Sequence, residues 1–207
     1  MALKGVLHIT TGWKDNRTFL SNSYCTPPFK LADVTEDASR RKLQLMMMTS
    51  SPGVLDGDQY HLRIELGEHS DVSLKTQSYQ RLFEMKKGAR QVTEIFLGES
   101  SRFVYLPQPV VPHQNANFST INNIHLSGQS TLMLGEVLTP GRQLNGEVFS
   151  FTRYHSTTQV YLDNRLIVKD NLLLEPAARP VGGMGLLEGY THQASFLVIQ
   201  ADVDFAN

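Results

Sequence analysis

The sequence predicts a mostly β protein with little helix, built as a single domain. Short segments of the chain alternate apolar and polar side chains, which is typical of strands that bury one face. Glycine, proline, serine and aspartate separate these segments, as expected for tight turns. A unit of strand, turn and strand also recurs at a near-constant interval. These observations favour either a stack of repeated β units or an antiparallel β-sandwich.

The segment 60–66 shows the strand pattern most clearly. Tyr60, Leu62 and Ile64 alternate with polar residues, so one face of this strand is expected to be buried. The acidic turn before it contains Gly57, which allows a positive φ. By the same pattern the expected strands are, in chain order, 6–11, 43–49, 60–66, 72–76, 92–97, 103–106, 121–126, 131–137, 148–154, 159–162, 166–168 and 194–201.

A helix is expected at one place before residue 170, over 35–41. Thr35 is its candidate N-cap, and two acidic residues follow near the positive end of the helix dipole. The loop-rich break at 175–185 lies too near the end of the chain to separate a second domain. We therefore expect one domain over 1–207.

The internal repeat is visible in three turns. Leu66, Leu97 and Leu126 each end an alternating strand, precede a short turn with glycine and serine, and are followed by another strand. The leucines are 31 and 29 residues apart. Stacked β units would produce this period, and so would the regular hairpins of a sandwich. The period alone leaves both architectures open.

The composition excludes several classes of partner. The chain has 207 residues with 19 basic and 20 acidic side chains, and it has no basic cluster beyond adjacent pairs. Nucleic acid and an anionic membrane are therefore not expected as partners. Cys25 is the only cysteine, which excludes an intrachain disulfide and fits a reducing compartment. No apolar run approaches a membrane span and no signal peptide is evident, so the expected location is cytoplasmic.

Motifs that carry chemistry are scarce. The sequence has no nucleophile elbow, zinc-protease motif, Cys-x-x-Cys pair or phosphate-binding loop, so no catalytic residue is expected. Asp56 and Asp58 are interpreted as turn formers, with a carboxylate pair as the alternative. Cys25 is expected to be a buried free thiol, and Met46 to Met48 a strand buried on both sides. The histidines have no short ligand spacing; they are His8, His61, His69, His113, His125, His155 and His192. Of these, His61 and His125 on the polar phase of their strands and His69 in a turn are expected as exposed imidazoles.

Five segments, in order along nearly the whole chain, resemble the UreD (UreH) urease accessory protein family. They are Thr26-Pro27-Pro28-Phe29-Lys30-Leu31, Ser51 to Asp58, Thr76-Gln77-Ser78, Leu106 to Pro112 before Asn115-Ala116, and Glu136-Val137-Leu138 before Gly141-Arg142. The chain departs from the family in two ways. Asp56-Gly57-Asp58 stands where many members have a glycine pair before the aspartate, and members usually continue for some tens of residues beyond the position of Asn207.

The resemblance implies both a fold and a function. The fold is a β-helix-like stack of two sheets, here without the usual C-terminal extension of the family. The function is that of a non-enzymatic scaffold and nickel metallochaperone that links apo-urease to the accessory proteins UreF and UreG. No cofactor is expected to bind tightly: nickel is in transit through a polar interior tunnel, and GTP is bound by UreG.

The resemblance also selects candidate site residues. Asp58 in the acidic turn and Glu136 are the expected carboxylates of a transient nickel path, because weak oxygen ligands release a divalent ion more readily than thiolates do. Arg142 is the expected orienting partner of Glu136. The residues alone leave two alternatives, a module that binds a carbohydrate or another small ligand on an aromatic face, and a hydrolase with Asp56 and Asp58 as its acid pair.

Overall fold

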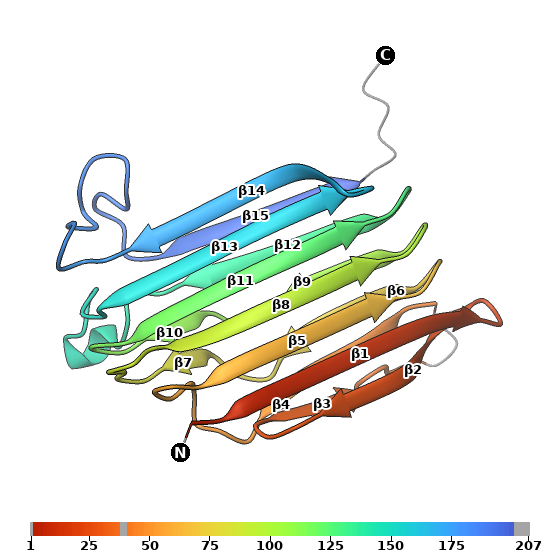
Figure 1. Cartoon of the computed structure of the whole chain (residues 1–207), viewed down its shortest axis with the longest axis horizontal. Helices are drawn as coiled ribbons and strands as arrows, with labels where there is room; N and C mark the ends of the chain where they lie inside the picture. Colours follow the sequence, from red (N-terminus) through yellow and green to blue (C-terminus); the bar gives the residue numbers. More distant parts are fainter. Residues whose placement is uncertain (1, 38–40, 201–207) are drawn as a thin grey trace, which may run out of the picture.

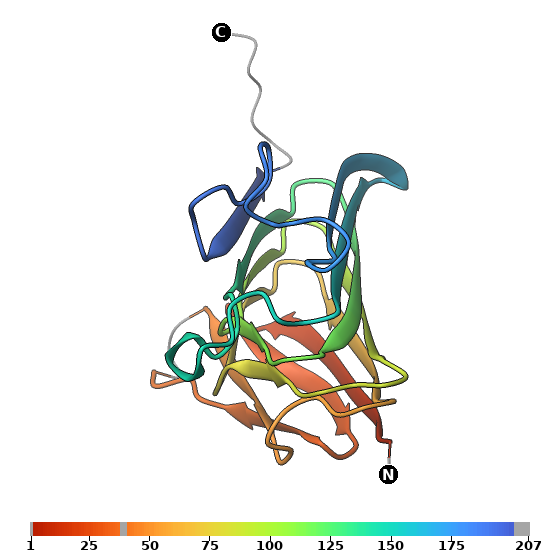
Figure 2. The same ribbon diagram turned by 90° about the vertical axis from the view of Figure 1, so that its left-hand side faces the viewer.

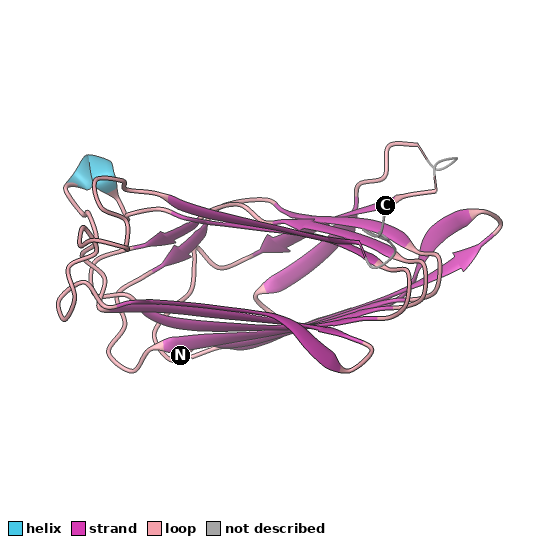
Figure 3. Ribbon diagram, turned by 90° about the horizontal axis from the view of Figure 1, so that it is seen from above, coloured by secondary structure: helices cyan, strands magenta, loops and turns pink. Residues whose placement is uncertain are grey.

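A computed structural model describes residues 2–37 and 41–200, and it arranges their strands in two sheets that face each other (Figures 1 and 3). The first sheet has seven strands. In spatial order they are β14 (Arg165–Leu174), β13 (Arg153–Leu162), β11 (Asn117–Leu126), β8 (Ala89–Leu97), β5 (Gln59–Leu66), β1 (Lys4–Lys14) and β2 (Arg17–Cys25). The five central strands, β13 to β1, run parallel, and each outermost strand is antiparallel to its neighbour.

The second sheet has eight strands. Its order is β3 (Phe29–Asp33), β4 (Leu43–Thr49), β6 (Asp71–Thr76), β9 (Arg102–Leu106), β12 (Thr131–Leu138), β10 (Val110–Pro112) and β7 (Gln80–Leu82), and β15 (Gln193–Gln200) pairs antiparallel with β12. A single 3-10 turn, η1 (Gln143–Asn145), follows β12. No helix within 2–37 and 41–200 is long and apolar enough to cross a bilayer.

From β4 to β13 the chain alternates between the two sheets, and each return to a sheet adds a strand parallel to its neighbour from the preceding coil. Thus β5 is followed by β6 in the second sheet, β8 by β9, and β11 by β12. The rainbow colouring of Figure 1 follows this progression from β1 to β14. Parallel neighbours joined through the opposite sheet are the mark of a β-helix-like stack, so the stack is confirmed over the antiparallel sandwich.

The leucine repeat marks successive coils of this stack. Leu97 is the register partner of both Leu66 and Leu126, and Leu126 also pairs with Leu162. The turns that follow them bond to one another, since the backbone amide of His69 donates to the carbonyl of Glu99 at 2.9 Å. The repeat predicted from spacing is therefore a structural repeat.

The core lies between the sheets and is formed by the inward phase of their strands. Two apolar rows cross the first sheet side by side: one contains Leu66, Leu97, Leu126 and Leu162, and the other Ile9, Ile64, Ile95, Ile124 and Val160. The isoleucines and Val160 are at most 1% exposed. Burying such side chains is the main favourable term in folding, with about 2–5 kcal/mol lost for each truncation to alanine.

Several local predictions differ from the structure. No helix forms at Thr35: its hydroxyl instead accepts a hydrogen bond from the Gln44 amide at 2.9 Å, while 38–40 lie outside the described residues. The expected strand 148–154 begins only at Arg153, and residue 201 of the last expected strand also lies outside the description. Strands β2, β3, β7 and β10 were not predicted, because they are short or mostly polar.

Two expectations about sulfur-containing residues are wrong in part. Cys25 is exposed at the end of β2, because that strand lies at the edge of the sheet. Met47 is buried, but Met46 and Met48 on the opposite phase of β4 are partly exposed. The three methionines therefore point to alternate faces as predicted, with only one face in the core.

Candidate functional site: a polar interior between the two sheets

The interior changes from apolar to polar within one sheet. Next to the isoleucine row, and two residues earlier on each of the parallel strands, a row runs through Leu7, Leu62, Thr93, Asn122 and Thr158, and it continues to Asp170 on β14. The row beyond it contains Tyr60, Gln91, Thr120 and Ser156. From β8 to β13 both rows are therefore polar. Thr93, Asn122 and Thr158 are each at most 7% exposed, so the polarity lies inside the protein.

These buried groups bond to one another and to the opposite sheet. The Asn122 amide donates to the Thr158 hydroxyl at 3.0 Å and to Oε1 of Glu136, on β12, at 3.3 Å. Gln91 donates to Thr93 at 3.3 Å and receives a hydrogen bond from Gln80 at 3.1 Å. Such bonds offset the cost of burying polar groups, which otherwise destabilises a core.

The polar rows line a cavity of about 100 Å³ between the sheets. A water molecule needs about 10–15 Å³ on this measure, so the space is large enough for several. Its walls combine aromatic rings with oxygen-bearing and amide side chains. The lining includes Tyr60, Gln80, Gln91, Tyr105, Thr120, Asn122, Glu136 and Tyr154.

Glu136 is the carboxylate in this lining. Burial raises its pKa, and the charge of Asp170 adds to the rise, while hydrogen bonds from Asn122 and Ser156 oppose it. Tyr105 and Tyr154 lie close by, since burial and then the charge of Glu136 raise the pKa of each. The site therefore holds one acid group in a poorly solvated surrounding, where binding a cation would relieve the cost of its charge.

Asp58 is not part of this lining. It is fully buried, and its carboxylate accepts hydrogen bonds from the Leu3 amide at 2.8 Å, the Leu55 amide at 2.9 Å and the Tyr60 hydroxyl at 2.7 Å. Gly57 before it has φ 83°, which agrees with the predicted turn. This carboxylate holds the start of β1 against the acidic turn. Asp56 is used similarly, because it accepts hydrogen bonds from the amides of Lys87 and Gly88.

Arg142 lies after β12, just before η1, and pairs with Glu147. Its Nε donates to Oε2 of Glu147 at 2.9 Å, and a second contact joins the same two side chains. This hydrogen bond raises the pKa of Arg142 and lowers that of Glu147. Within the described residues no bond joins Arg142 to Glu136, whose orienting partner is Asn122 instead.

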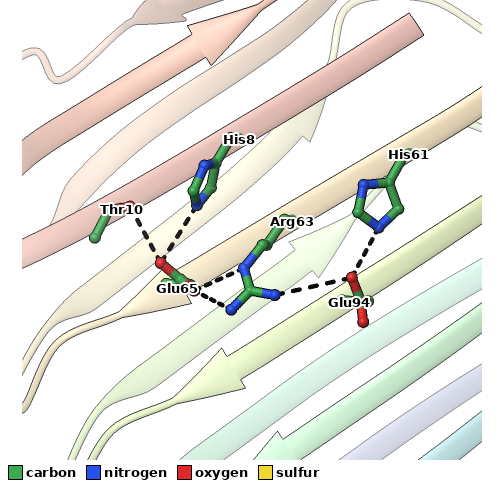
Figure 4. Close-up of polar contacts among 6 residues, drawn as sticks. All are labelled: His8, Thr10, His61, Arg63, Glu65 and Glu94. Atoms are coloured by element: carbon green, nitrogen blue, oxygen red, sulfur yellow. Dashed lines mark hydrogen bonds and ion pairs between the residues drawn. The ribbon is translucent and has the colours of Figure 1, made fainter. Parts of the chain in front are cut away.

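A second cluster of polar side chains lies on the outer face of the first sheet (Figure 4). His61 contacts Glu94 at 2.7 Å, His8 contacts Glu65 at 3.3 Å, and Arg63 lies between the two glutamates. Burial pushes the pKa of Glu65 upward, but the hydrogen bonds from Arg63 and His8 outweigh it and lower the pKa. His61 is on the polar phase of its strand, as expected from the sequence, and His8 is on the polar phase of β1.

On the same outer face, aromatic rings from β8, β11 and β13 stack on one another. His125 lies between Phe96 and Tyr161 with centroid distances of 4.9 and 5.0 Å, and the Arg63 guanidinium lies 4.6 Å from the Phe96 ring centre. Among the residues that the structure describes, no group of three or more His, Cys, Asp or Glu is arranged to hold a metal ion. The interior cavity, with its single lining carboxylate among the described residues, is therefore the candidate functional site.

Comparison with known proteins decides the family. A model of the UreD urease accessory protein family matches residues 3–207. The chain belongs to the UreD family. The urease accessory protein UreD of Flavobacterium johnsoniae is 40% identical over 198 residues, which cover 96% of this chain and 72% of the relative. UreD of Acetivibrio thermocellus is 35% identical over 190 residues, covering 91% and 72%, and UreD of Haemophilus influenzae is 37% identical over 188 residues, covering 86% and 72%.

Membership confirms the family expected from the five motifs. The chain is thus a UreD urease accessory protein, a non-catalytic scaffold involved in urease maturation. The alternatives of a carbohydrate-binding module and an acid-pair hydrolase are not supported. The second alternative also lacks its geometry, because both aspartates bond to backbone amides.

The sequence singled out Glu136, which lines the cavity, but the polar rows around it were not predicted. The leucine repeat contains a pattern that indicates these rows. Four residues before the leucines at 66, 97 and 126 stand Leu62, Thr93 and Asn122, all on the buried phase of their strands. The hydroxyl of Thr93 and the amide of Asn122, at positions where the alternation predicts core residues, indicate a polar interior.

Proposed function

We propose that the polar interior conducts nickel during urease maturation, and that this chain links apo-urease to UreF and UreG while the ion passes. The observation that carries the proposal is the cavity with room for water that Gln91, Thr120, Asn122 and Glu136 line together, inside the protein. An interior that served stability alone would favour apolar side chains at these positions, as the adjoining isoleucine row has.

The chemistry of this lining suits passage better than storage. One carboxylate with hydroxyl and amide neighbours gives a divalent ion few and weak oxygen ligands, so the ion keeps much of its water and exchanges readily. Thiolate or multi-histidine cages would hold nickel more tightly. In this proposal Glu136 supplies the charge that attracts the ion, and Asn122 orients Glu136.

Three further parts of the proposal rest on family membership and on the sequence. UreF and UreG are the proposed partners, together with the apo-urease subunits. GTP is assigned to UreG, because this chain carries no phosphate-binding loop motif. The proposed compartment is the cytoplasm, because a single cysteine that cannot form an intrachain disulfide fits a reducing compartment.

The other two candidate residues have different proposed roles. Asp58 is proposed as a structural residue of the turn and Arg142 as a partner of Glu147.

The test is a reconstituted maturation reaction with apo-urease, UreF, UreG and GTP. Wild type, Glu136→Gln and a surface control, Glu68→Gln, are compared for co-elution of the complex and for nickel bound by urease over time. Glu68 is exposed at the turn after β5. We expect all three to co-elute and Glu136→Gln alone to slow nickel transfer, by about tenfold. Transfer at the wild-type rate by Glu136→Gln would reject the path through this cavity.

A further inference from the structure

A second, smaller cavity lies beside the first, toward the last strands of the two sheets. It has a volume of about 20 Å³, which is close to the space of one water molecule. It lies among β12, β13, β14 and β15. Its polar lining consists of Glu136, Tyr154, Ser156, Asp170, Gln193 and Ser195.

The two cavities share walls. Glu136, Val137 and Tyr154 line both of them, so Glu136 stands between the larger interior space and the smaller one. Asp170 lines only the smaller cavity and is exposed, so this cavity continues from the core to the surface. Figure 2 shows β15, in blue, on the side opposite the hairpin of β13 and β14 at the upper end of the stack. The opening therefore lies where the last strands of the two sheets face each other.

One buried side-chain oxygen at the smaller cavity lacks a hydrogen-bond donor. Oε1 of Gln193 is buried and has no hydrogen-bond partner within residues 2–37 and 41–200. A buried amide oxygen without a donor is unfavourable unless a water molecule or a cation supplies the missing interaction. Because this oxygen lines the same cavity as two carboxylates, an ion or its water is the chemically suitable occupant.

We propose that this cavity is the port through which a divalent ion passes between Glu136 and the protein surface, with Asp170 as the outer carboxylate and the Gln193 amide oxygen as a third oxygen ligand that replaces part of its water. This inference rests on the proposed function and adds the direction in which the ion travels between the interior and the surface. The ion moves across the strands, along the row that ends at Asp170, and meets solvent or a partner between β14 and β15.

Electrostatics supports the pairing of the two carboxylates. The charge of Asp170 raises the pKa of Glu136, so the two groups are close enough to repel each other. A divalent cation between them would neutralise both and remove that repulsion. Asp170 also pairs with Thr158 in the strand register, which places it at the end of the buried row and not apart from it.

The first experiment separates the port from the interior path. Asp170→Asn, Asp170→Glu and the control Asp163→Asn, in the turn between β13 and β14, are compared with Glu136→Gln in the reconstituted reaction. We expect Asp170→Asn to slow nickel transfer by about tenfold, Asp170→Glu to retain most of the rate because it keeps the charge, and Asp163→Asn to behave as wild type. Thermal unfolding and co-elution are measured for every variant.

The second experiment blocks the port without removing a carboxylate. In a Cys25→Ser background, Ser195→Cys places a thiol in the cavity, and the control Ala194→Cys places one on the opposite face of β15. A bulky thiol reagent is added after the complex has assembled. Nickel transfer should stop after modification at 195 and continue after modification at 194, with co-elution unchanged in both.

The outcomes distinguish the port from the proposed function. If Glu136→Gln is slow while Asp170→Asn and the modified Ser195→Cys transfer nickel at the wild-type rate, the interior path stands and the port is wrong. If Glu136→Gln is itself as fast as wild type, the proposed function fails and the port fails with it. Slow transfer in Asp170→Asn together with a block at 195 supports both.

Discussion

Two neighbouring rows on the inner face of the first sheet are both buried from β8 to β13 and differ in chemistry. Ile124 is 0% exposed and Asn122, two residues earlier on β11, is 7% exposed. The first belongs to a row of isoleucine and valine, the second to a row that becomes polar at β8 and ends in Asp170. Burial alone would place apolar residues in both. The difference teaches that the polar row serves something other than the stability of the stack.

The largest effect is expected from making the apolar row polar. Ile124→Asn would bury an amide among isoleucine and valine neighbours without a designed partner, and it would also lose apolar volume. We expect a loss of about 3–5 kcal/mol in the free energy of unfolding. Urea denaturation measures it. A loss below about 1 kcal/mol would mean that this row tolerates polar groups as well as its neighbour does.

The next largest effect is expected at Asp58. Asp58→Ala removes the acceptor of three donors, the amides of Leu3 and Leu55 and the buried hydroxyl of Tyr60. We expect a loss of about 2–4 kcal/mol, with nickel transfer falling only as far as the folded fraction falls. Transfer that collapses in a fully folded Asp58→Ala complex would return this carboxylate to the ion path.

A smaller and pH-dependent effect is expected at Glu136. Its pKa is raised in the folded state, chiefly by burial, so its contribution to stability is fully present below the ordinary glutamate pKa and is lost as the pH rises through the raised value. Wild type should therefore lose stability relative to Glu136→Gln over this interval. Denaturation midpoints measured against pH test this, and parallel curves would contradict it.

The smallest effect is expected on the outer face. Glu94→Gln weakens the contact with His61, whose side chain is 47% exposed, and the more distant contact with Arg63. Partly exposed pairs contribute about 0–1 kcal/mol, so stability and nickel transfer should both stay near wild type. A large loss of co-elution with intact folding would instead identify this face as a partner surface.

The sequence predicted the architecture well where one face of a strand is apolar. The alternation at 60–66 and the leucine repeat marked the central strands and their stacking, because both reflect side chains that meet in one core. It failed at β2 and β3, whose mostly exposed residues carry no alternation. The helix expected at Thr35 failed because the capping signal is equally satisfied by a bond to the Gln44 amide across a loop.

The site was predicted less completely than the fold. Glu136 was found through a family motif, but its partner Asn122 was not, because that bond joins residues of opposite sheets. Arg142 was expected beside Glu136 from proximity along the chain, and the turn after β12 directs it to Glu147 instead. Asp170 lies 34 residues from Glu136 in the sequence, and only the strand register and the shared cavity bring them together.

The most direct test of the ion path fills the polar row with apolar side chains of similar size. The double variant Asn122→Leu and Thr158→Val removes the buried hydrogen bond between these residues as a pair, but it also removes the bond from Asn122 to Glu136, so we expect a loss of about 1–3 kcal/mol in stability. The account predicts a folded variant that assembles with its partners and transfers nickel at least about tenfold more slowly than wild type. Transfer at the wild-type rate through an apolar row would contradict the central claim.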